Sequence, residues 1–96
     1  MGIAATQARL MMIVGYKSDL EFAMQMIAQK KMYLCYQAQA AAENYPELAA
    51  QYHLLDKRLD MELKTLETQH KMVSAEWDSV KKVLNDNIEK SMKYLT

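Results

Sequence analysis

The sequence predicts an all-α protein, a helical hairpin of two long antiparallel helices with a turn at about residues 43–46. The chain of 96 residues has two glycines and one proline, too few for the turns that a sheet protein requires. Ala, Leu, Met, Lys, Glu and Gln, all strong helix formers, are abundant. A length of 96 residues predicts one domain over residues 1–96, and the single proline, Pro46, lies near its middle.

The first helix is expected at about residues 3–43, and its apolar side chains are spread around it. One stripe can face a second helix: Leu20, Met24, Ile27, Leu34, Ala38 and Ala42, interrupted by Lys31. A second set does not fit this stripe: Met11, Met12, Val14, Phe22, Met26, Met32, Tyr33 and Tyr36. A helix with apolar residues nearly all round is normally buried on several sides, which one neighbouring helix cannot provide.

A hinge within the first helix is suggested at residues 15–18. Gly15 is followed by "SDLE", a capping-box pattern in which Ser18 and Glu21 would begin a new helix. One continuous helix through Gly15 costs about 1 kcal/mol relative to alanine there. We favour continuity and keep the hinge as the alternative.

The turn is expected around "AENYPEL", residues 42–48. Pro46 disfavours helix at Tyr45 and suits the first position of a new helix. Asn44 could end the first helix in the left-handed conformation, and Glu47 would lie favourably in the first turn of the second.

The second helix is expected at about residues 46–94 and is amphipathic. Its apolar seam has a mean spacing close to 3.6 residues, with His70 filling one gap: Tyr52, Leu55, Leu59, Leu63, Leu66, Val73, Trp77, Val80, Leu84, Ile88, Met92 and Leu95. The opposite side carries acid-before-base pairs four residues apart, such as Asp60–Lys64, which indicate a surface facing water.

Charge and chemistry exclude several classes of function. The formal net charge is zero, which argues against a nucleic-acid partner. His53 and His70 have no companion at metal-ligand spacing, Cys35 has no base near it in sequence, and no phosphate loop or zinc motif occurs. We therefore expect no enzyme, no metal and no cofactor, and we interpret Cys35 as a buried small apolar residue.

A membrane span is also disfavoured. The apolar run "LMMIVGY" is far shorter than the ~20 residues that a spanning helix needs, and Lys17, Asp19 and Glu21 follow it closely. The chain shows no secretory signal of the usual kind.

Two segments, "NYPELAAQYHLLDKRLDMEL" and "DSVKKVLNDNIEKSMKYL", resemble needle subunits of bacterial type III secretion systems. The matching positions are Pro46, Leu48, Tyr52, Val80, Val83, Ile88 and the tail to Leu95. The resemblance covers the second half of the chain and implies a hairpin that assembles into a filament. This turn has a single proline where such subunits usually have two, and the start "GIAATQAR" instead resembles small uncharacterised bacterial proteins.

These observations lead to one leading hypothesis, a non-enzymatic, self-assembling structural protein such as a subunit of a secreted bacterial filament. The expected assembly interface is Leu10, Met11, Val14, Phe22, Met26, Val80, Val83, Ile88, Met92 and Leu95. The alternative is a coiled-coil adaptor or secretion co-chaperone that binds a partner helix, and the second alternative is a peripheral membrane protein. The resemblance implies a bacterial protein, either secreted without a cleaved signal peptide or cytoplasmic.

Overall fold

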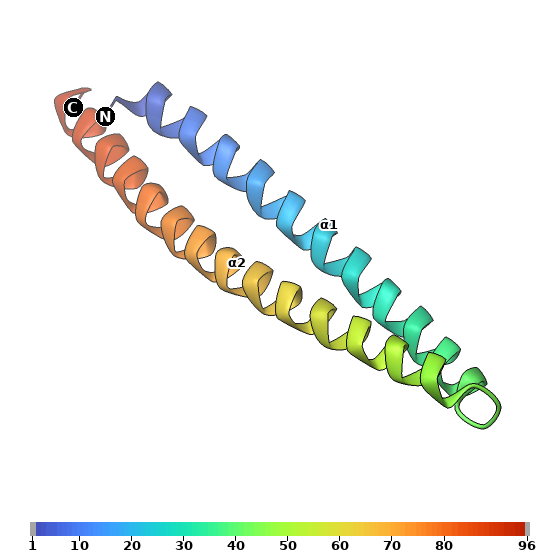
Figure 1. Cartoon of the computed structure of the whole chain (residues 1–96). Helices are drawn as coiled ribbons and strands as arrows, with labels where there is room; N and C mark the ends of the chain where they lie inside the picture. Colours follow the sequence, from blue (N-terminus) through green and yellow to red (C-terminus); the bar gives the residue numbers. More distant parts are fainter. Residues whose placement is uncertain (1, 96) are drawn as a thin grey trace. The chain divides into compact units, whose positions relative to one another are not determined.

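The structure, a computed structural model, describes residues 2–95. Helix α1 spans Ile3–Ala41 and helix α2 spans Pro46–Leu95, joined by a short turn (Figure 1). No strand occurs within residues 2–95. The predicted all-α helical hairpin is therefore confirmed.

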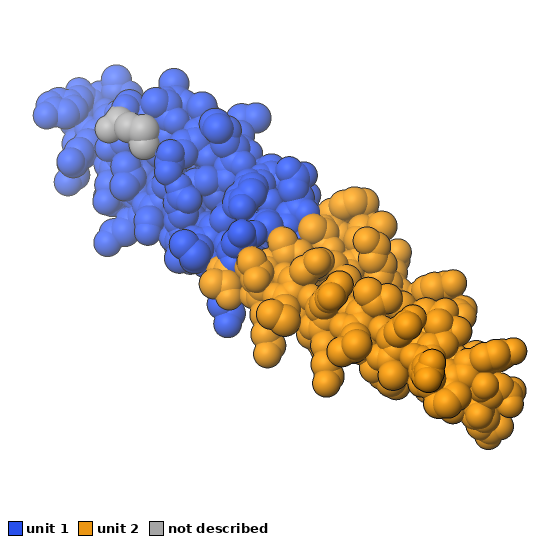
Figure 2. Space-filling model, in the orientation of Figure 1, with its two compact units in different colours: residues 1–20, 69–96 blue, residues 21–68 orange. Residues whose placement is uncertain are grey.

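The chain forms two compact units, each made from one segment of either helix (Figure 2). Unit 1 comprises residues 1–20 and 69–96, and unit 2 comprises residues 21–68, including the turn. In unit 2, Lys31 of α1 is ion-paired with Asp56 and Asp60 of α2, so the two helix segments lie against each other there. In unit 1, Arg9 and Glu76 make the corresponding pair.

Helix α1 is continuous through the segment that suggested a hinge. Residues 15–18 are all α-helical, and no glycine in the described chain has a positive φ. Ser18 lies inside the helix, so the capping-box interpretation is wrong for this structure. The helix ends at Ala41, two residues earlier than predicted.

The turn closes with local backbone hydrogen bonds rather than with a left-handed residue. The Tyr45 amide donates to the Ala41 carbonyl at 2.8 Å, and the Ala49 amide donates to the Tyr45 carbonyl at 3.0 Å. Because no non-glycine residue among those described has a positive φ, the left-handed conformation predicted for Asn44 is wrong. Pro46 opens α2 as predicted, at a position where its missing N–H leaves no hydrogen bond unmade.

Burial along α1 repeats every seven residues, which is the pattern of a coiled coil. We label these positions by heptad letters, with the more buried residues at a and d. The d positions are Thr6, Ile13, Leu20, Ile27, Leu34 and Ala41, and the a positions are Ile3, Leu10, Lys17, Met24, Lys31 and Ala38. All of these side chains are buried or half-buried.

Helix α2 follows the same repeat. Its a positions are Ala49, Asp56, Leu63, His70, Trp77 and Leu84, and its d positions are Tyr52, Leu59, Leu66, Val73, Val80 and Asn87, all buried or half-buried. The a and d positions of both helices together are called the seam below. Its most buried large aliphatic residues are Ile13, Leu20, Ile27, Val73 and Val80, each with at most 8% of its surface exposed.

The repeat of seven corrects the predicted seam. A stripe with a period of 3.6 residues drifts by about 20° per heptad relative to a period of 3.5, so it leaves the partner helix after a few turns. Leu55, which was placed on the seam, falls at a g position and is 44% exposed. Ala42 is likewise exposed, and its neighbour Ala41 is buried instead.

Candidate interaction surface

The outer side of α1, formed by heptad positions b, c and f, is almost without charge. Its residues are Ala4, Ala5, Ala8, Met11, Met12, Gly15, Ser18, Asp19, Phe22, Gln25, Met26, Gln29, Met32, Tyr33, Tyr36, Gln39 and Ala40. Asp19 is the only charged residue among them. In unit 1, Met11 and Met12 are each 76% exposed, and in unit 2 Phe22 and Tyr36 are each 65% exposed. Large apolar side chains therefore face away from the only neighbouring helix.

The outer side of α2 has the opposite character. The same heptad positions of α2 carry a charged residue at Glu47, Lys57, Arg58, Lys64, Lys71, Asp78, Lys82, Asp86, Glu89 and Lys93. Only a few large apolar residues, such as Leu54 and Met61, lie among them. This side is suited to water, so the two helices present outer surfaces of different chemistry.

A shallow groove of about 370 Å³ lies between the two helix segments of unit 2, and we call it the unit 2 groove. It is lined by Lys30, Tyr33, Leu34, Leu55, Arg58, Leu59 and Glu62. These residues occupy the g, c and d positions of both helices. Its floor is formed by the half-buried Leu34 and Leu59, and the exposed Tyr33 and Leu55 stand at its sides.

Unit 1 has a smaller groove at the same heptad positions, lined by Arg9, Met12, Ile13, Tyr16, Val73 and Glu76. A neighbouring hollow shares three of these residues and adds Gln69 and Met72. The ion pair between Arg9 and Glu76 joins the two walls of the smaller groove. Both side chains are about half exposed, so this pair contributes no more than about 1 kcal/mol.

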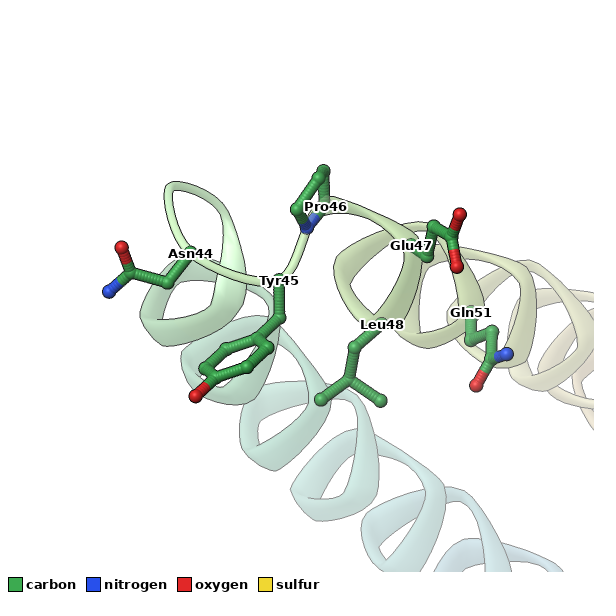
Figure 3. Close-up of a pocket in the computed structure, with 6 residues that line it drawn as sticks. All are labelled: Asn44, Tyr45, Pro46, Glu47, Leu48 and Gln51. Carbon is green, nitrogen blue, oxygen red and sulfur yellow. The ribbon is translucent and has the colours of Figure 1, made fainter.

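A further hollow lies at the turn and is lined by Asn44, Tyr45, Pro46, Glu47, Leu48 and Gln51. Figure 3 shows the ring of Tyr45 and the side chain of Leu48 on the same side of the turn, with the Asn44 amide pointing away from them. Tyr45 is 64% exposed and Leu48 is 40% exposed. They extend the exposed apolar surface of unit 2 to its turn.

The seam itself contains a charged cluster in unit 2. The Lys31 ammonium group donates a hydrogen bond to Asp56 at 3.0 Å and another to Asp60. The hydrogen bond to Asp60 raises the pKa of Lys31 above its ordinary value of 10.5, and the hydrogen bond to Asp56 raises it further. The sequence suggested that Asp60 pairs with Lys64 on its own helix; in the structure it pairs with Lys31 of α1.

The structure places most of the predicted assembly residues at the surface. Exposed are Met11, Val14, Phe22, Met26, Val83, Ile88, Met92 and Leu95, from 37% for Ile88 to 86% for Leu95. Phe22 and Met26 belong to unit 2 and the other six to unit 1. The six in unit 1 do not share one face, because they are distributed over heptad positions b, e and g.

Two of the predicted assembly residues lie on the seam instead. Val80 is only 8% exposed at a d position, so its place in the expected interface is corrected to the core of unit 1. Leu10 is half-buried at an a position. Conversely, the groove residues Tyr16, Tyr33 and Leu55 are absent from the expected assembly interface. A repeat of seven would have placed them at the g and c positions beside the seam.

Cys35 belongs to unit 2 and His70 to unit 1. Cys35 is exposed at an e position, so its predicted burial is wrong. His70 is half-buried on the seam at an a position. Within residues 2–95, no group of three or more His, Cys, Asp or Glu side chains is arranged to hold a metal ion. Neither described helix combines the length and the apolar character needed to cross a membrane.

Comparisons of the chain with protein-family models, with curated proteins and with solved structures give no significant match.

Proposed function

We propose that the protein is a non-enzymatic structural protein that self-assembles through the outer side of α1. The observation that carries this proposal is the run of exposed, uncharged side chains on that side, such as Met11 and Met12 in unit 1 and Phe22 and Met26 in unit 2. Burial of apolar surface stabilises association by about 25 cal/mol per Å² removed from water. Adjacent exposed apolar residues of this kind typically mark a contact surface.

The charges favour a second copy of the chain as the partner that covers the outer side of α1. The formal net charge is zero, so copies do not repel one another over a distance. The outer side of α1 offers no charged group besides Asp19 that would select an oppositely charged partner. The outer side of α1 in another copy supplies the apolar contacts that this surface lacks within a single hairpin.

The resemblance of the second half to secretion needle subunits suggests a filament as the form of assembly. A filament needs a head-to-tail contact between different surfaces of the subunit, whereas a contact between identical surfaces closes at two copies. Negative-stain microscopy of the purified protein separates these forms. Filaments would support the needle-like role, and a small closed oligomer would favour the adaptor interpretation.

The test of self-assembly is sedimentation velocity of the wild type and of two substitutions, Met26→Glu and Met61→Glu, over about a hundredfold range of concentration. Met26 lies on the outer side of α1, and Met61, which is 71% exposed, lies on the outer side of α2. We expect Met26→Glu to reduce the associated fraction strongly and Met61→Glu to leave it nearly unchanged. Circular dichroism should show equal helix content in all three.

A wild type that stays monomeric at every concentration would overturn the proposal. Equal loss of association in both variants would also overturn it, because the contact would then not be specific to α1. Met11→Glu extends the same comparison to unit 1, where Met11 is 76% exposed.

A further inference from the structure

We propose that the unit 2 groove is a contact between two copies of the chain, related by a two-fold axis, in which Arg58 of each copy pairs with Glu62 of the other. This inference rests on the proposed self-assembly and names the contact that it uses. It goes beyond the outer side of α1, since the groove is lined by both helices.

The charges around the groove lack partners within the hairpin. Among residues 2–95, no ion pair joins Lys30, Arg58 or Glu62 to another side chain, whereas Arg9 and Lys31 are both paired with acids of α2. All three side chains are exposed at the edge of a groove whose floor is leucine. The groove therefore presents an apolar centre with charges of both signs beside it.

Such a surface is complementary to itself. Arg58 and Glu62 are four residues apart on α2, so they lie on the same side of the helix and about 6 Å apart along its axis. When two such helices run antiparallel about a two-fold axis between these residues, each arginine meets the glutamate of the other copy. The contact then contains the pair twice, as isologous interfaces do.

The apolar pattern of both helices supports this arrangement. Helices that face the core of a four-helix bundle carry apolar residues at a and d and also at a flanking position. In unit 2 the flanking g positions of α2 carry Leu48 and Leu55, and the c positions of α1, one step further out, carry Met26 and Tyr33; all four are between 40% and 61% exposed. Two hairpins joined through this side would bury them in a bundle of four helices.

An acidic or basic partner of another kind fits less well. A groove that bound an acidic ligand would need Lys30 and Arg58 without the nearby carboxylate of Glu62. A ligand that bound through Glu62 would meet the two cations. A partner with an acid and a base at a matching separation pairs with both Arg58 and Glu62, and a second copy has them. Lys30 stays exposed at the edge of the groove.

The test is a charge exchange measured by sedimentation equilibrium on four proteins: wild type, Arg58→Glu, Glu62→Arg and the double variant with both changes. We expect each single change to weaken dimerisation about tenfold or more, because like charges meet at two symmetric places. The double variant should return to within about threefold of the wild type, since the pair is restored with its charges exchanged. Lys57→Glu, at an exposed b position of α2, is the matched control and should have little effect.

The outcomes separate this inference from the proposed function. Association of the wild type with no effect of either single change would overturn the two-fold contact and leave self-assembly standing. A double variant that stays as weak as the single variants would also overturn it. A monomeric wild type would overturn both. Weakening by Arg58→Glu together with strengthening by Glu62→Arg would contradict the pairing of Arg58 with Glu62 and would overturn the inference.

Discussion

Lys31 of α1 donates a hydrogen bond of 3.0 Å to Asp56 of α2, and both residues occupy a positions of the seam. The lysine side chain is 24% exposed and the aspartate side chain 35%, so the pair is half-buried. A shift of α2 by one heptad would place Ala49 or Leu63 where Asp56 lies and would leave Lys31 without this partner. The pair therefore favours one register of the hairpin, as polar residues at a positions do in coiled coils.

The pH dependence of stability should reveal this pair. The hydrogen bonds to Asp60 and Asp56 raise the pKa of Lys31 above 10.5, its ordinary value. Its contribution to the free energy of unfolding is therefore complete below pH 10.5 and is lost as the pH rises through the raised pKa of the folded state. We expect the urea midpoint, followed by circular dichroism, to fall in that alkaline range.

The chain contains six tyrosines and several other lysines, so the comparison requires a variant at position 31. Lys31→Arg keeps a cation at position 31 throughout the alkaline range and should lose less stability than the wild type. Lys30→Arg, at the exposed neighbouring position, is the control and should behave like the wild type. Equal alkaline losses in the wild type and in Lys31→Arg would contradict the role assigned to this lysine.

Two adjacent residues of α1 should differ sharply in their effect on stability. Ile27 is 7% exposed on the seam, and its replacement by alanine should lower the free energy of unfolding by about 2–3 kcal/mol. Met26 is 41% exposed, and the same replacement there should change it by less than about 0.5 kcal/mol. Urea denaturation at a protein concentration below that of association measures both. Equal losses at the two positions would mean that α1 is rotated from the orientation described.

The sequence predicted the helices more reliably than their contacts. Helix α2 was well defined because its charged and apolar residues separate cleanly, and Pro46 marks its first residue. In α1 the apolar residues lie on every side, so hydrophobicity alone cannot decide which stripe is buried. Leu34 and Met32 are equally apolar, and only packing against α2 makes the first half-buried and leaves the second exposed.

The grooves and the charged pairs depend on register, which a single sequence does not specify. Asp60 has a suitable lysine four residues later on its own helix, and only the fold shows that Lys31 takes this acid instead. Val80 and Val83 are three residues apart on α2, yet the first is buried and the second is 43% exposed. A difference of this kind follows from the phase of the heptad and not from residue type.

Thr6 should tolerate the loss of its hydroxyl group but not the loss of its volume. It is fully buried at a d position, and its hydroxyl donates to the Gly2 carbonyl at 2.9 Å. That carbonyl also accepts the Thr6 amide at 3.0 Å, so it stays satisfied in Thr6→Val. We expect Thr6→Val to change the free energy of unfolding by less than about 0.5 kcal/mol and Thr6→Ala to lower it by ~1 kcal/mol. A larger loss in the valine variant, measured by thermal denaturation, would show that the hydroxyl itself is required.

Gly15 offers a direct test of the hinge that the sequence suggested. It lies inside α1 without a positive φ, and a Cβ added there would meet no atom within 4 Å. Alanine should therefore fit the folded state and raise the free energy of unfolding by about 0.5–1 kcal/mol, because it has less conformational freedom in the unfolded chain. Thermal denaturation of Gly15→Ala below the concentration of association measures this gain, with Ala8→Gly, at the preceding f position, as the reverse control. Lower stability in Gly15→Ala would mean that the folded chain needs a bend at Gly15. A gain in stability accompanied by weaker association would instead mean that another copy packs closely against this glycine.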